Sequence, residues 1–140
     1  MNRLHSLRSF AVLALLALLS FNAGARSAPF EDPAPISVTG GMSIEGVRKS
    51  VKVALIGRNW VISEDTGNKI TASYAKKDWS ATIVVAYGLR EISIKYADST
   101  NLDFSQNEDG TREVHPNYSK WIANLVMDIS KNILLMSPTG

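Results

Sequence analysis

The sequence contains no cysteine. This absence excludes disulfides, lipid-modified cysteines and metal sites that depend on thiolate ligands. A chain of this length can bury about two-thirds of the surface that its unfolded form exposes, so a hydrophobic core alone can stabilise it. Small secreted domains of animal cells usually contain disulfides, and an exported domain without cysteine therefore fits a bacterial periplasm better.

Long hydrophobic runs are also scarce, and the one present, residues 10–21, lies near the N-terminus. Arg3 and Arg8 precede this run, and Ala23-Gly24-Ala25 supplies the small residues that signal peptidase requires, which completes the pattern of a secretory signal peptide. The run is much shorter than the roughly 20 residues of a membrane-spanning helix, although an uncleaved anchor is the alternative. We predict cleavage after Ala25 and a soluble, periplasmic mature chain without a transmembrane segment.

Little net charge remains after this cleavage. The whole chain has 15 basic and 13 acidic residues, and removing Arg3 and Arg8 leaves 13 of each sign. A nucleic-acid binder normally carries a basic surface that neutralises phosphates, so nucleic acid is not predicted as a partner. His115 is the one histidine outside the signal, and with no cysteine beside it neither a metal site nor a cofactor is predicted.

The mature chain has the size and composition of a single domain. Residues 26–42 contain Pro29, Pro33, Pro35 and a Gly-Gly pair, which predicts a flexible linker. The globular domain is therefore expected over residues 43–136.

Two stretches have the spacing of amphipathic helices. The first begins after Ser43, a favourable N-cap, and is expected to end at Gly57 in the left-handed conformation. The second runs from Tyr118 to about Leu135. Their apolar residues recur every three or four positions: Ile44, Val47, Val51, Ala54 and Leu55 in the first, and Tyr118, Trp121, Ile122, Leu125, Ile129 and Ile133 in the second.

Four segments between the helices predict strands: residues 59–63, 70–74, 82–87 and 91–97. Short polar turns separate them, which indicates neighbouring antiparallel strands. The fold class predicted is α+β, a two-layer sandwich in which a four-stranded antiparallel meander carries two helices on one face, in the order α-β-β-β-β-α. The other face, with Thr71, Ser73, Ser93 and Lys95, would meet solvent or a partner.

Residues 98–117 are polar and are expected to form a long irregular loop, which in a small domain is functional or disordered. Candidate binding residues are Ser99, Asn101, His115 and Tyr118 in and beside this loop, together with Trp79 in a turn. Asp98, Ser99 and His115 could be combined into a hydrolase triad, but no glycines typical of a nucleophile elbow flank Ser99, and no catalytic residue is assigned. For His115 the favoured interpretation is that it helps to start the second helix.

Several motifs together resemble a group of small, uncharacterised exported bacterial proteins. The motifs are Trp60 after the first helix, Gly67-x-x-Ile70-x-Ala72, Tyr96-x-x-Ser99-x-Asn101-Leu102 and His115-x-x-Tyr118-x-x-Trp121-x-x-x-Leu125. The resemblance spans residues 43–134 and implies an α+β fold and an exported location, with no activity attached. Many members of the group resemble lipoproteins, whereas this chain lacks the cysteine.

These observations predict a monomeric, non-catalytic binding or protein-interaction module with an envelope protein or a small ligand as partner. A small envelope hydrolase using His115 is the alternative. A third possibility is an envelope-maintenance factor whose sheet edges accept a strand of another chain.

Overall fold

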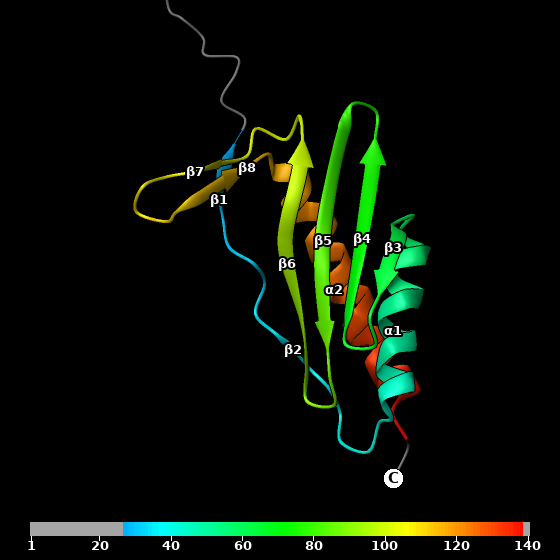
Figure 1. The fold of residues 1–140 in the computed structure, drawn as a ribbon. Helices are drawn as coiled ribbons and strands as arrows, with labels where there is room; N and C mark the ends of the chain where they lie inside the picture. The colour runs from blue at the N-terminus through cyan, green and yellow to red at the C-terminus, as the bar shows by residue number, and fades with distance from the viewer. Residues whose placement is uncertain (1–26, 139–140) are drawn as a thin grey trace, which may run out of the picture.

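The computed structural model describes residues 27–138. Its fold is α+β, with two helices, a five-stranded antiparallel sheet and a three-stranded antiparallel sheet (Figure 1). The predicted signal peptide and its cleavage site after Ala25 lie outside the described residues. Within residues 27–138, no helix combines the length and the apolar character needed to cross a membrane.

The five-stranded sheet has the order β2-β6-β5-β4-β3. Its strands are β2 (Ile36–Ser37), β3 (Val61–Asp65), β4 (Lys69–Lys76), β5 (Trp79–Tyr87) and β6 (Glu91–Thr100). The prediction of four strands is therefore one strand short, because the two residues of β2 pair with the start of β6. A two-residue strand carries too little alternation to be recognised in the sequence.

One face of this sheet is buried in the core. In β5, Ala81, Ile83, Val85 and Tyr87 are buried and alternate with partly exposed residues, as expected of a strand with one covered face. The pairing with β6 shifts by one residue between Thr82 and Ile83, so that Ser99 lies opposite Ala81. This bulge places Ser99 on the same face of the sheet as the buried residues.

The helices α1 (Ile44–Gly57) and α2 (Pro116–Met136) pack against each other. Figure 1 shows α2 behind the sheet and α1 beside β3. Arg58 Nε donates to Asp128 Oδ2 over 2.7 Å, and Asn132 Nδ2 donates to the Ser50 carbonyl over 3.0 Å. These contacts fix the two helices side by side and leave the buried residues in one continuous core.

The helix α1 ends at Gly57, the residue predicted, but the position of its left-handed residue differs from the prediction. Gly57 was expected in the left-handed conformation, but Asn59 takes it, with φ of 63°. The Asn59 amide donates to the Ile56 carbonyl and the Trp60 amide to the Leu55 carbonyl, which is the hydrogen bonding of a Schellman motif. Because Asn tolerates positive φ better than most residues, the left-handed residue can lie two positions after Gly57, and the following Trp60 is buried in the core.

The predicted flexible linker, residues 26–42, is wrong for the part that the structure describes. Within it, β1 (Ala28–Phe30) pairs with β8 (Arg112–Val114), and β2 joins the larger sheet. Asp32 Oδ1 accepts a hydrogen bond from the Tyr96 amide over 2.9 Å, and its Oδ2 lies 3.2 Å from Arg112 Nη2. The segment is held by partners distant in sequence, which its proline content did not indicate.

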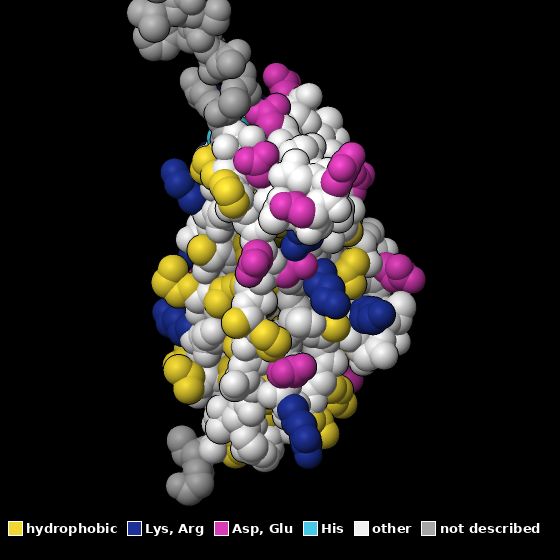
Figure 2. Space-filling view, turned by 90° about the vertical axis from the view of Figure 1, so that its left-hand side faces the viewer, with side chains coloured by type: hydrophobic (Ala, Val, Ile, Leu, Met, Phe, Trp, Pro, Cys, Tyr) yellow, Lys and Arg dark blue, Asp and Glu magenta, His cyan; other side chains and the backbone are white. Residues whose placement is uncertain are grey.

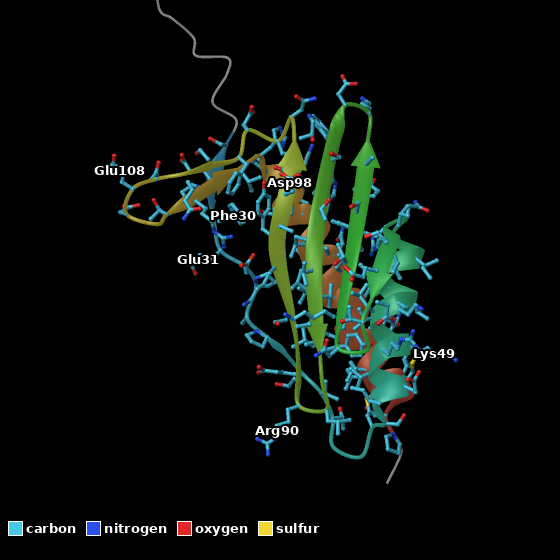
Figure 3. The ribbon with its side chains drawn as sticks, in the orientation of Figure 1. Phe30, Glu31, Lys49, Arg90, Asp98 and Glu108 are labelled. Carbon is cyan, nitrogen blue, oxygen red and sulfur yellow. The ribbon has the colours of Figure 1, made fainter. Side chains whose placement is uncertain are left out.

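The expected irregular loop, residues 98–117, also contains regular structure. Its first residues extend β6, and β7 (Ser105–Gln106) pairs with β8 to complete the three-stranded sheet β1-β8-β7. Figure 2 shows acidic side chains in the upper part of the face that carries this sheet. Glu108 lies at the tip of the β7–β8 hairpin and points away from the molecule (Figure 3).

Candidate functional site

The five candidate residues from the sequence lie at one end of the large sheet, near the turn between β4 and β5. Asn101 Nδ2 donates to the Asp78 carbonyl in that turn over 2.8 Å. The ring of Trp79 lies 5.1 Å from the ring of His115. The Ser99 and Tyr96 hydroxyls are 2.6 Å apart, and the Tyr96 ring lies 5.4 Å from that of Tyr118. The fold thus brings these residues together, but mainly in contacts that stabilise it.

His115 is the N-cap of α2. Its Nδ1 accepts a hydrogen bond from the Asn117 amide over 3.1 Å, and Pro116 occupies the first position of the helix. In the neutral ring the proton therefore lies on Nε2. The His115 amide in turn donates to the Leu102 carbonyl over 2.7 Å. The Ser99 hydroxyl is hydrogen-bonded to the Tyr96 hydroxyl. No hydrogen bond joins Ser99 to His115 in the described chain, so the geometry favours a structural role for both.

We expect the variant His115→Ala to lose roughly 1 kcal/mol of unfolding free energy, because alanine cannot accept the Asn117 amide. His115→Asn, whose side-chain oxygen is a good cap, should recover most of that loss. Urea unfolding followed by circular dichroism measures both variants. Equal losses in the two would show that the ring contact with Trp79, rather than the cap, is what His115 contributes.

Tyr118 belongs to an aromatic cluster formed by Phe30, Tyr96, Phe104 and Tyr118. Tyr96 stacks on Phe104 with ring centroids 4.3 Å apart, and Phe30 contacts Tyr118 edge-on at 5.4 Å. Phe30 lies in β1, a strand of the three-stranded sheet, and Figure 3 shows it on the side of that sheet toward β6. Burial, with a smaller contribution from Asp32, raises the pKa of Tyr118 far above its ordinary value. Its side chain therefore joins the two sheets and is not displayed to a ligand.

Two residues of the loop after β6 have left-handed backbones. Asn101 has φ of 57° and Asp103 has φ of 51°, and both residue types adopt this conformation more readily than most. Between them Leu102 is buried, with 1% of its surface exposed. The two reversals turn Leu102 into the core and leave Asn101 on the surface, where its side chain holds the β4–β5 turn.

A groove of about 510 Å³ lies between the end of α1, the end of β4 and the first turns of α2, and we call it the basic groove. Its side chains comprise three aromatic rings, three cations and three amides. They are Trp60, Tyr74 and Trp121; Arg58, Lys76 and Lys120; and Asn59, Asn117 and Asn124. No carboxylate lines it, so its electrostatic potential is set by the cations.

The aromatic rings form the packed wall of this groove. Tyr74 contacts Trp121 edge-on with ring centroids 4.8 Å apart and Trp60 at 5.5 Å. Trp60 is buried, whereas Trp121, which belongs to the apolar spacing of the second predicted helix, remains half-exposed. Trp121 thus offers part of its ring to the groove.

The polar side chains of the basic groove have few partners. Arg58 is paired with Asp128, but no carboxylate among residues 27–138 pairs with Lys76 or Lys120. The amides of Asn59, Asn117 and Asn124 make no side-chain hydrogen bond within the same range. The described asparagines outside the groove, by contrast, each make one: Asn68, Asn101, Asn107 and Asn132.

Sequence reasoning did not identify the basic groove. One local signal was present: an aromatic residue directly follows a basic residue or an amide in Arg58-Asn59-Trp60 and in Lys120-Trp121. Trp121 was placed in the apolar spacing of the second predicted helix and Trp60 in the first predicted strand. Nothing in the pattern indicated that the two segments meet.

No group of three or more His, Asp or Glu side chains within residues 27–138 is placed to hold a metal ion. Comparison of the chain with protein-family models, with curated proteins and with solved structures finds no significant match. The resemblance to exported bacterial proteins therefore stays a prediction, and the function has to be argued from the site.

Proposed function

We propose that the protein is a non-catalytic binding module of the bacterial periplasm and that the basic groove is its binding site. The observation that carries this proposal is the concentration of unpaired polar groups there. Lys76, Lys120 and three asparagine side chains lie around one groove without partners among the described residues. Binding sites in proteins combine a concave, partly aromatic wall with a few polar groups that are free to contact the ligand.

Binding without turnover is favoured by the same geometry. A hydrolase would need a nucleophile within hydrogen-bond reach of a general base. The nearest candidates, Ser99 and His115, are engaged with Tyr96 and with the helix backbone. The groove itself is lined by cations, amides and aromatic rings and has no carboxylate, serine or histidine.

The architecture we propose around this site has both helices on one face of the meander β3 to β6. The opposite face carries Thr71, Ser73 and Ser93, which are partly exposed, and Lys95, which is exposed. This polar face remains available to an envelope protein. The groove, at the end of the sheet beside α2, is separate from it.

Photo-crosslinking in the living cell tests the proposal. A photoreactive amino acid is placed at Asn124 in the groove, at Lys95 on the open face, or at Glu108 on the hairpin tip as a control. The protein is then purified and its intact mass measured. We expect an adduct from Asn124 and none from Glu108. No adduct from Asn124, or an adduct from Lys95 alone, contradicts the groove as the binding site.

A further inference from the structure

We infer that the basic groove takes an acidic sugar, meaning a hydroxyl-bearing ring with one carboxylate or phosphate group. This inference rests on the proposed function and names the class of its ligand. Three features of the groove carry it, which are the unpaired ammonium groups, the unused asparagine amides and the half-exposed ring of Trp121.

The positive charge of the groove favours an anionic ligand. Lys76 at the end of β4 and Lys120 in the first turns of α2 approach the groove from two different elements. Neither ammonium group is neutralised by a carboxylate of residues 27–138, and Arg58, although paired with Asp128, adds a third positive group to the rim. An anion in the groove would therefore make charge-assisted hydrogen bonds without displacing an existing ion pair, except at Arg58.

The asparagines indicate that the anion also carries hydroxyl groups. An amide side chain both donates and accepts, as a sugar hydroxyl does, so the two can pair in either direction. Asn59 follows α1, Asn117 and Asn124 both lie on α2, and all three retain this capacity. A bare inorganic anion could use only their donors.

The ring of Trp121 fits the remaining part of such a ligand. An aromatic face offers apolar surface to the C–H groups of a sugar ring and can lie beside polar contacts at its rim. Trp121 packs edge-on against Tyr74, and Tyr74 packs against Trp60. The wall is therefore rigid before a ligand arrives, which limits the entropy lost on binding.

Asn59 supplies a variant that separates binding from folding. Its φ of 63° lies in the left-handed region, which glycine adopts with less steric strain than any other residue. Asn59→Gly therefore removes an amide from the groove while the melting temperature stays unchanged or rises. A drop in affinity in this variant cannot be attributed to unfolding.

Isothermal titration calorimetry on the protein, purified as the cell processes it, tests the inference. The probes are sodium glucuronate, glucose 6-phosphate, glucose and inorganic phosphate. We expect the first two to bind, and glucose and phosphate each to bind roughly tenfold more weakly, because each lacks one kind of contact.

Variants of the groove test the same inference. Glucuronate binding should weaken several-fold in each of Lys76→Gln, Lys120→Gln and Asn59→Gly. Lys77→Gln, next to Lys76 in the chain, and Lys131→Gln, on the same helix as Lys120, do not alter the lining of the groove and should leave the affinity within about twofold.

The outcomes separate this inference from the proposed function. Binding of glucose as tight as that of glucuronate overturns the requirement for an anion, and binding of phosphate as tight as that of glucose 6-phosphate overturns the sugar. If no probe binds, the ligand class is wrong, while an in-cell adduct at Asn124 would still support the binding site. Weakening by Lys131→Gln equal to that by Lys120→Gln would show that net charge, and not the groove, holds the anion.

Discussion

Replacing Ile83 with alanine is expected to lower the free energy of unfolding by roughly 3 kcal/mol. Ile83 lies in the middle of β5, opposite Ala72 of β4 and Tyr96 of β6, and its side chain is 0% exposed. The truncation removes buried methyl groups and leaves a cavity that the surrounding strands cannot close. Urea unfolding followed by tryptophan fluorescence measures the loss, which should lower the melting temperature by about 10 °C or more.

Val84→Ala is the matched control for this variant. Val84 is the next residue of the same strand, lies opposite Thr71 and Lys95, and is only partly buried. On a sheet with helices on one face, the same kind of truncation at Val84 should cost less than about 1 kcal/mol. Equal losses at the two positions would mean that the face we propose to be open is covered.

Replacing Asp65 with alanine is expected to lower the free energy of unfolding by roughly 2–3 kcal/mol. The carboxylate lies at the end of β3, and its side chain is 11% exposed. It accepts hydrogen bonds from Arg48 Nε over 2.6 Å, from the Tyr87 hydroxyl over 2.9 Å and from the Gly67 amide over 3.1 Å. Alanine leaves the hydroxyl of the buried Tyr87 without its acceptor and separates α1 from the β3–β4 turn.

The contribution of Asp65 should depend on pH. Burial by itself raises the pKa of this carboxyl, but the hydrogen bonds from Arg48, Gly67 and Tyr87 together lower it below its ordinary value. A carboxyl with a lowered folded-state pKa contributes stability above its unfolded pKa of about 4 and loses it as the pH falls through the folded value. The difference in unfolding free energy between wild type and Asp65→Ala should therefore be full at pH 7 and shrink below about pH 4.

Asp128→Ala is the control for Asp65→Ala. Asp128 also binds an arginine, but the side chains of that pair, Arg58 and Asp128, are 42% and 29% exposed. An ion pair so accessible to solvent contributes at most about 1 kcal/mol. If the two variants lost the same stability, the hydrogen bonds from Tyr87 and Gly67 to Asp65 would not contribute to the stability.

Much of the secondary structure could be predicted because it depends on local pattern. The alternation of Ile92, Ile94 and Tyr96 predicted β6, and the helical spacing of Ile122, Leu125 and Ile129 predicted α2. These side chains are buried or half-buried as the periods require. The N-cap role favoured for His115 also depends on neighbours in sequence, and the geometry agrees with it.

The predictions failed where a partner distant in sequence decides the conformation. Residues 28–37 contain three prolines and no period, yet β1 and β2 form because β8 and β6 present backbone groups to them. At the end of α1, glycine was the better local choice for a left-handed residue. Asn59 adopts that conformation instead: Gly57 stays helical, Arg58 is the cap, and the residue after Asn59 is the buried Trp60.

The sequence by itself determined that this chain has no disulfide, that its helices and most of its strands are amphipathic, and which face of most of these elements is buried. Only the tertiary structure decided the candidate binding site. Asn59 and Lys120 are far apart in the chain, and their neighbours Trp60 and Trp121 meet through Tyr74 once α1, β4 and α2 pack around the same core. Side-chain periodicity specifies which face of an element is buried, but it carries no information about which exposed edges of different elements come to lie around one groove.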